Sequence, residues 1–233
     1  MNGEIVSVSK TGYHVLVDGE EKFCLINNSF RSTKPPIVND VVEIEQREDK
    51  YFILDVAPRK NFIARFDADT QKHQYFAANI DTAFIVTSAN LEFSPARIRR
   101  FMSLIEGKRI KCVIVLTKMD TNHPAAYVAR MQAGQLGVDC VAINALDPND
   151  VGKLLTYWKP GESAMLMGSS GVGKSTIINT LGNLSIETRE AQGDRRLNQG
   201  RHTTSARTMY YLQCGRKIID NPGVKLVASQ ENV

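Results

Sequence analysis

Nine consecutive residues in the second half of the sequence have the composition and spacing of a phosphate-binding loop. The segment fits the pattern G-x-x-x-x-G-K-[ST] and consists of Gly168, Ser169, Ser170, Gly171, Val172, Gly173, Lys174, Ser175 and Thr176. Glycine permits the tight turns that bring backbone N–H groups against phosphate oxygens, and a following helix directs its positive dipole end at the same anion. We therefore expect these nine residues to contact a nucleotide. The alternative is a glycine-rich turn that only links a strand to a helix.

Five side chains are candidates for the outer phosphates and a metal ion. Lys174 is placed to reach those phosphates, which makes it a predicted catalytic residue, and Ser175 has the hydroxyl that can hold Mg²⁺. Asp220 follows a short apolar run, where its carboxylate can hold the same ion through water. Thr203 or Thr204 can add a hydroxyl if residues 200–204 form a switch-like loop. For Asp220 the alternative is a plain Asn-Pro-Gly turn.

A second group of residues is suited to selecting the base. Thr117, Lys118 and Asp120 directly follow an apolar strand-like run. A carboxylate only accepts hydrogen bonds, so Asp120 can pair with the ring N–H and the amine of guanine, whereas adenine offers an acceptor at the ring position. Lys118 can lay its stem along the base, and Asn144 with Ala145 can offer a backbone N–H to the guanine carbonyl oxygen. The group therefore predicts guanine selectivity.

The elements that must position these residues alternate between strands and helices. Continuous apolar runs are typical of parallel strands that are buried on both faces, and helical patterns separate them. The runs are residues 80–86, 112–116, 138–143 and 164–167, and helices are expected at about 95–105, 122–136, 149–158 and after the phosphate loop. This pattern predicts an α/β parallel sheet, and open sheets of this kind bind ligands at the carboxyl ends of their strands.

The first 62 residues have a different pattern. Short runs alternate apolar and polar residues between turn signals, which predicts a small antiparallel barrel of the OB type. Its rings could stack on RNA bases or could belong to the core, and they are Tyr13, Phe23, Phe30, Tyr51 and Phe52. We expect a connector over residues 63–75 and a nucleotide-binding domain over residues 76–233.

The composition of the chain constrains its function and location less strongly than the motifs do. The 233 residues carry a formal net charge of +4, which is too small to indicate a nucleic-acid-binding protein by itself. The four cysteines are far apart in the sequence and form no C-x-x-C pair, so we expect reduced thiols and no zinc site. No apolar run is long enough for a bilayer span or a signal sequence, so we expect a cytoplasmic monomer that does not bind membranes.

The order of the motifs resembles a known family. Residues 117–120, which would recognise guanine, precede the phosphate loop rather than follow it, so the arrangement is circularly permuted. Together with the barrel, the turn at 38–42, the junction at 58–61 and residues 220–223, the chain resembles the ribosome small-subunit-dependent GTPase A family, the RsgA or YjeQ type. The resemblance implies a circularly permuted P-loop GTPase domain that follows an OB-like barrel. It also implies Mg²⁺-dependent hydrolysis of GTP to GDP, late maturation of the small ribosomal subunit, and contact of the barrel with ribosomal RNA.

Several features of the sequence depart from this family. Thr117 stands where many GTPases have asparagine, Asn144 stands where serine is usual, and the zinc-binding carboxyl-terminal domain of the family has no counterpart. No glutamine follows Gly223, where many GTPases position the attacking water, so His202 is the predicted catalytic residue for that role. A loop histidine without a role is the alternative. Two other functions remain open, namely a guanine-nucleotide-binding module with negligible hydrolysis and a P-loop kinase for a small molecule.

Overall fold

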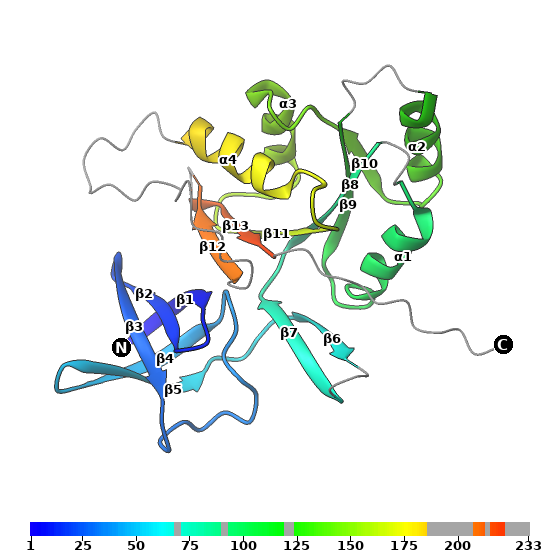
Figure 1. Cartoon of the computed structure of the whole chain (residues 1–233). Helices are drawn as coiled ribbons and strands as arrows, with labels where there is room; N and C mark the ends of the chain where they lie inside the picture. Colours follow the sequence, from blue (N-terminus) through cyan, green and yellow to red (C-terminus); the bar gives the residue numbers. More distant parts are fainter. Residues whose placement is uncertain (68–70, 90–92, 119–123, 186–206, 213–214, 222–233) are drawn as a thin grey trace.

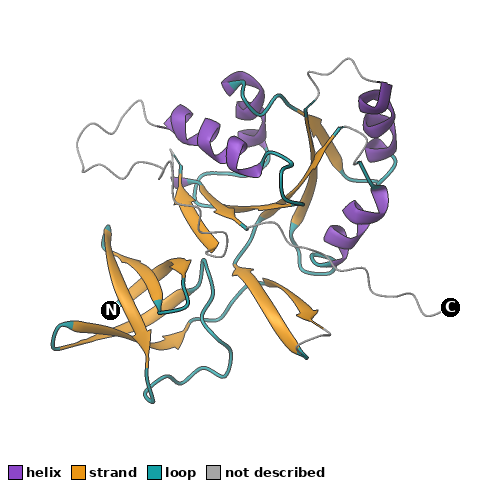
Figure 2. Cartoon of the chain, in the orientation of Figure 1, coloured by secondary structure: helices purple, strands orange, loops and turns teal. Residues whose placement is uncertain are grey.

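The computed structural model describes residues 1–67, 71–89, 93–118, 124–185, 207–212 and 215–221. These residues form a small β-barrel, a two-stranded hairpin and a larger domain in which helices cover a sheet (Figures 1 and 2). None of the described helices combines the length and the apolar character that a bilayer span needs.

The amino-terminal barrel contains five strands. They are β1 (Asn2–Val8), β2 (Tyr13–Val17), β3 (Glu20–Ile26), β4 (Val41–Arg47) and β5 (Lys50–Val56). The strand order is β1-β2-β3-β5-β4, and a second pairing of β1 with β4 closes the barrel. Asp18 and Gly19 both have positive φ, 48° and 84°, as a tight hairpin turn between β2 and β3 requires. The alternating pattern therefore forms the OB-like barrel that we expected, with inward residues such as Ile5, Val15 and Ile53 fully buried. The barrel is not wholly antiparallel as predicted, because β3 and β5 pair in parallel.

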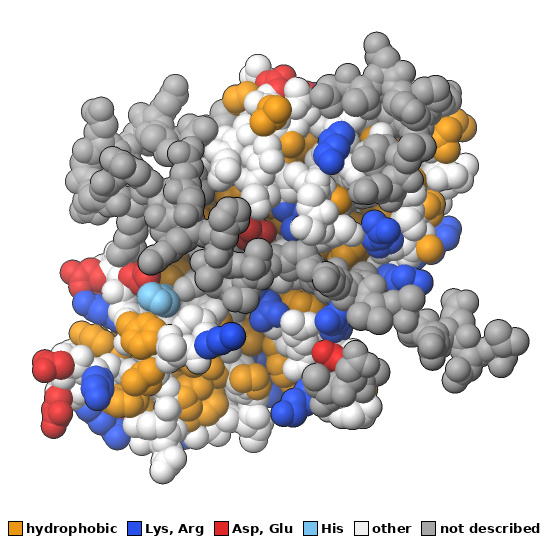
Figure 3. Space-filling view, viewed as in Figure 1, with side chains coloured by type: hydrophobic (Ala, Val, Ile, Leu, Met, Phe, Trp, Pro, Cys, Tyr) orange, Lys and Arg blue, Asp and Glu red, His pale blue; other side chains and the backbone are white. Residues whose placement is uncertain are grey.

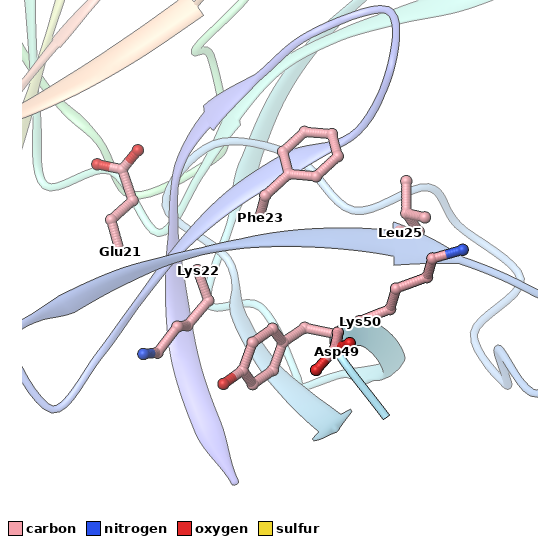
Figure 4. A pocket seen from close by; sticks show the side chains of 7 residues that line it. Glu21, Lys22, Phe23, Leu25, Asp49 and Lys50 are labelled. Carbon is pink, nitrogen blue, oxygen red and sulfur yellow. The ribbon is translucent and has the colours of Figure 1, made fainter. Parts of the chain in front are cut away.

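Most of the barrel's aromatic side chains contribute to its core. Tyr13, Phe30 and Tyr51 pack against the buried residues, whereas Phe23 is 44% exposed. Phe23 lines an open hollow of about 430 Å³ on the outside of the barrel (Figure 4). The other residues that line this hollow are Glu21, Lys22, Leu25, Asp49, Lys50 and Tyr51. The hollow therefore combines rings with charges of both signs, and Figure 3 shows the same mixture of hydrophobic, basic and acidic side chains over the barrel.

The larger domain is built on a mostly parallel sheet. Its strands are β8 (Thr82–Ser88), β9 (Lys111–Thr117), β10 (Asp139–Ala142), β11 (Ser163–Met167), β12 (Arg207–Tyr211) and β13 (Lys217–Asp220). Their order is β10-β9-β8-β11-β13-β12, and within it only β12 runs antiparallel to its neighbour. The apolar runs of β8, β9 and β11 thus form mostly buried parallel strands, as predicted, whereas β10 at the edge is only partly buried.

Helices cover both faces of this sheet (Figure 2). On one face, α1 (Pro95–Ser103) and α2 (Pro124–Gly134) contribute Ile98, Phe101 and Ala129 to one core. On the other face lie α3 (Pro148–Gly152), a 3₁₀ turn at Lys153–Thr156, and α4 (Lys174–Ser185), which contributes Ile177 and Leu181 to a second core. Ser94 caps α1 by accepting a hydrogen bond from the Arg97 N–H, and Pro95 occupies its first turn, where both residue types are favoured.

Residues 63–75, which we expected to be a connector, lie largely within a β-hairpin. Its strands are β6 (Phe62–Asp67) and β7 (Lys72–Ala78), which form a two-stranded sheet. Ala77 of β7 also makes an isolated parallel bridge with Val38. The pairing register shifts between Ile63 and Ala64. Such an irregularity interrupts the two-residue alternation by which a strand is recognised in a sequence. The domain boundaries that we placed at residues 62 and 75 remain predictions.

Strand β1 of the barrel joins the larger sheet. It pairs antiparallel with β12, with Ser7 opposite Thr208 and Val8 opposite Arg207. Next to this pairing, the Glu4 carboxylate of β1 accepts hydrogen bonds from the Tyr211 hydroxyl and the Lys217 ammonium group. The barrel and the larger domain are therefore connected by the backbone pairing of β1 with β12 and by the two hydrogen bonds of Glu4, which we call the Glu4 clasp.

Candidate nucleotide-binding site

The phosphate loop lies between β11 and α4, as a strand–loop–helix motif requires. Gly168 follows the strand with φ of 151°, and a Cβ atom built on it would lie 2.3 Å from the main-chain oxygen of Val86. Gly171 and Gly173 also have positive φ, at 79° and 102°. L-residues with side chains rarely adopt these conformations, so the loop needs its glycines for backbone geometry. At the other end, Ile177 N–H donates to the Gly173 carbonyl at 2.9 Å and begins the helix.

Lys174 is held against the loop. Its side chain is buried, with 7% of the residue exposed, and its ammonium group donates to the main-chain oxygens of Gly168 at 2.9 Å and Ser169 at 2.7 Å. Burial lowers the pKa of Lys174, and the charge of Asp220 partly opposes that effect. A cation that is buried beside backbone dipoles is favourably placed to receive an anionic ligand.

Thr117 contacts the phosphate loop. It is fully buried at the end of β9, and its hydroxyl donates to the Val172 carbonyl at 2.7 Å. A Cβ atom built on Gly173 would lie 3.6 Å from Thr117 Cγ2 and 3.8 Å from Ala145 Cβ. The segments that we assigned to the base and to the phosphates therefore meet at Gly173, although they are far apart in the sequence.

Hydrogen bonds fix the turn after β10. The N–H of Asn144 donates to the Asp150 carboxylate at 2.9 Å, and the Asn144 side-chain oxygen accepts from the Leu146 N–H at 3.0 Å. The Asn144 N–H and the nearby Lys153 hold the pKa of Asp150 below its usual value. From α4, the Thr180 hydroxyl donates to the Ala145 carbonyl at 2.7 Å. Asn144 and Ala145 are therefore anchored to α3 and α4 beside the phosphate loop.

Asp220 lies at the end of β13, next to the strand that leads into the phosphate loop. Its pairing partners are Leu166 of β11 and Thr208 of β12. Burial raises the pKa of Asp220, and Lys174 opposes this shift. Its Oδ1 atom is buried and has no hydrogen-bond partner among the described residues. Such an oxygen is suited to a metal ion or its water, and Ser175 is exposed in the first turn of α4.

Several predicted site residues lie outside the described part of the chain. They are Asp120, His202, Thr203 and Thr204, and their roles stay predictions. Lys118 is described, and it is exposed with φ of 59°. Among the described residues, no three His, Cys, Asp or Glu side chains form a group that could hold a metal ion.

The structure also brings Arg97 to the phosphate loop. Arg97 is exposed on α1, and it donates through Nη1 to the Ser169 hydroxyl at 3.4 Å. The contact joins α1, which follows β8, to the loop that follows β11, and these two strands are neighbours in the sheet. A strand order could have indicated this contact, but the local sequence pattern could not.

Comparison with known proteins identifies the family. A model of the RsgA GTPase family matches residues 56–230. The small ribosomal subunit biogenesis GTPase RsgA of Methanosarcina acetivorans is 36% identical over 229 residues, which cover 96% of this chain and 62% of that protein. A protein of the same name from Xanthomonas oryzae pv. oryzae (strain MAFF 311018) is 38% identical over 200 residues, covering 84% of this chain and 53% of its own length. The chain thus spans little more than half of these relatives.

Solved structures show the same fold. YjeQ from Thermotoga maritima superposes with a TM-score of 0.68 at 25% identity, over 95% of this chain and 74% of that one. YloQ, described as a circularly permuted GTPase, superposes with a TM-score of 0.62 at 23% identity, over 96% of this chain and 71% of its own. The strand order, the phosphate loop and these matches agree, and the chain belongs to the RsgA GTPase family.

Proposed function

We propose that this protein binds GTP with Mg²⁺, hydrolyses it to GDP and phosphate, and acts in late maturation of the small ribosomal subunit. The observation that carries the proposal is the meeting of three segments at Gly173, where Thr117 and Ala145 lie against the phosphate loop. This arrangement supports a site in which Thr117 and Ala145, at the ends of the segments assigned to guanine, lie next to the phosphate loop. Nucleotides bind at the carboxyl ends of the strands in open α/β folds.

The chain's own groups account for phosphate binding. The N–H groups of the glycine-rich loop and the amino-terminal end of α4 provide positive dipoles, and Lys174 provides a full charge. In this proposal Lys174 exchanges its two carbonyl acceptors for phosphate oxygens. Its charge then offsets the negative charge that builds up on the leaving phosphate.

Asp220 and Ser175 are the described residues that would hold Mg²⁺, with Thr203 or Thr204 as a further ligand. The buried Asp220 Oδ1, which has no partner among the described residues, supports this assignment. The ion would neutralise charge on the outer phosphates. His202 would orient the attacking water by accepting a hydrogen bond from it, and this role stays a prediction from the sequence.

Guanine selection is assigned to Asp120, with Lys118 along the base and the anchored turn at Asn144 and Ala145 beside it. An Asp120→Asn variant replaces an acceptor by a donor, so it should lose GTP affinity by orders of magnitude and gain affinity for xanthosine triphosphate. Asp139→Asn makes the same carboxylate-to-amide change at the exposed start of β10, away from this turn, and serves as a control. Equal affinity of the unaltered protein for ATP and GTP would refute the assignment.

The ribosomal role rests on the relatives, which are named as small ribosomal subunit biogenesis GTPases. We assign ribosomal RNA contact to the barrel, where Phe23 and Tyr51 share a hollow with Lys22 and Lys50 (Figure 4). We further propose that the protein works in the cytoplasm as a monomer.

GTP turnover with and without purified small ribosomal subunits tests the proposal. We expect slow hydrolysis by the protein alone and a rise of at least tenfold with subunits. The Lys174→Met variant should bind subunits and lack turnover in both conditions. Tight GTP binding without turnover in either condition would contradict the proposed hydrolysis and support a nucleotide-binding module. Transfer of phosphate to a small molecule, rather than to water, would indicate a kinase.

A further inference from the structure

Arg207 occupies a junction between three parts of the molecule. It is the first residue of β12 and pairs with Val8 of the barrel strand β1. Its guanidinium group lies 5.1 Å from the ring centre of Phe76, a buried residue of the hairpin strand β7. Its Nε donates to the side-chain oxygen of Asn221 at 3.4 Å. In Figure 1, β12 lies between β13 and the barrel, close to β7.

The contact with Asn221 bears on the phosphate site because Asn221 directly follows Asp220. Asn221 is 1% exposed, and its side-chain nitrogen has no hydrogen-bond partner among the described residues. The bond from Arg207 therefore satisfies the only side-chain oxygen of a buried amide. Without it, that oxygen would be buried and unpaired, which favours a change in the position of Asn221.

A change in the position of Asn221 would reach Asp220 through the backbone, because the two residues are adjacent. Ser7, Thr208 and Asp220 lie side by side on β1, β12 and β13, and Arg207 is the neighbour of Thr208 in this row. The guanidinium group has a second contact, with the ring of Phe76. Burial lowers the pKa of Arg207, with a smaller contribution from Arg65.

We propose that Arg207 is a positioning residue for the phosphate site, which holds Asn221 and thereby fixes the Asp220 carboxylate relative to the nucleotide. This inference rests on the proposed function. It adds a residue to which no motif assigns a role, and it places that residue where the barrel, the hairpin and the nucleotide-binding domain meet.

The test compares Arg207→Met with a matched control. Methionine keeps apolar contact with Phe76 and removes the donor to Asn221. The control is Arg216→Met, because Arg216 is also half-buried and donates through Nε to a carbonyl, that of Trp158, at 3.1 Å near the other end of the same strand pair. Both variants lose one guanidinium group and one hydrogen bond, so general losses of stability should be similar.

Mg²⁺ titrations provide the first measurement. We expect Arg207→Met to bind GDP within about twofold of the unaltered protein, and to need at least fivefold more Mg²⁺ for half-maximal binding of a non-hydrolysable GTP analogue. Arg216→Met should leave both values unchanged. Equal Mg²⁺ requirements for the two variants would overturn the inference. This readout does not depend on turnover, so a protein that binds but does not hydrolyse GTP would refute the proposed hydrolysis and still test Arg207.

A double-mutant cycle provides the second measurement, in the nucleotide-free protein. Amide hydrogen exchange at residues 218–221 should accelerate in Arg207→Met and in Asn221→Ala, and combining the two should add little to either one. Arg207→Lys, which keeps the charge and loses the planar donor, should exchange at an intermediate rate. Additive effects of the two substitutions would show that Arg207 acts on the fold without acting through Asn221.

Discussion

The Thr117 hydroxyl donates a hydrogen bond of 2.7 Å to the main-chain oxygen of Val172, across 55 positions of the sequence. Both groups are buried, and the bond joins the end of β9 to the middle of the phosphate loop. Residue 117 begins the segment that we assign to guanine. The bond therefore ties the start of this segment to the phosphate loop. Threonine can make this contact at a position where many GTPases have asparagine.

The Thr117→Val variant should weaken nucleotide binding. Valine keeps the shape of the side chain and leaves the Val172 carbonyl buried without its donor, at a cost of about 1–3 kcal/mol. We expect the affinities for GDP and GTP to fall about tenfold, as measured by isothermal titration calorimetry. Thr82→Val is the control, since Thr82 is equally buried and donates to the Tyr157 carbonyl away from the site. Equal loss of affinity in both variants would contradict the role of Thr117.

The Gly168→Ala variant should lose nucleotide binding and stability together. The added Cβ would lie 2.3 Å from the Val86 carbonyl oxygen, so β8 or the loop must move. We expect a loss of several kcal/mol in the free energy of unfolding, because backbone atoms cannot give way cheaply. Gly107→Ala is the comparison, because Gly107 also has positive φ, 71°, and open space around it. That change should cost only about 1 kcal/mol, and similar losses in urea unfolding would show that the contact with Val86 is unimportant.

The Glu4 clasp should hold the barrel to the nucleotide-binding domain. Glu4→Gln removes the charge that accepts from both Tyr211 and Lys217, and we expect a loss of about 1–3 kcal/mol in unfolding free energy. Amide exchange at Ser7 and Thr208 should accelerate as their strand pairing opens more often. Glu43→Gln is the control, because Glu43 pairs with Arg31 within the barrel and is more exposed. Unchanged exchange at both amides would mean that the strand pairing alone holds the two domains.

The Cys24 thiol should make the protein less stable at high pH. Cys24 is fully buried in the barrel, and burial raises its pKa to about 11 from an ordinary value of 9.0. A raised pKa in the folded state means that stability is complete below pH 9 and is lost as the pH rises toward 11. The loss should be on the order of 2 kcal/mol. Cys24→Ala should show a shallower decline in urea unfolding between pH 8 and pH 11. An identical decline would assign it to other groups, such as Cys112, whose pKa burial also raises to about 11.

Local sequence patterns predict those helices and strands whose signals lie within a few neighbouring residues. The apolar run that became β9 and the Ser94 cap of α1 depend on neighbouring residues, and both are visible in the sequence. The pairing of Ser7 with Thr208 is different, because it joins residues about 200 positions apart and no periodic pattern in the sequence indicates it. The same holds for the contact of Arg97 with Ser169 and for the bond between Thr117 and Val172. The sequence therefore predicts candidate residues for the site, but not the side chains that support them.

Phosphate release from GTP and from ATP, measured with Mg²⁺ and small ribosomal subunits present, tests the central claim most directly. We expect kcat/KM for GTP to exceed that for ATP by at least a hundredfold, because a site built for the hydrogen bonds of one base leaves its polar groups unpaired with the other. The Lys174→Ala variant should lose turnover of both. Similar kcat/KM values for the two nucleotides, or GTP turnover that persists in Lys174→Ala, would contradict the assignment of this site to GTP hydrolysis.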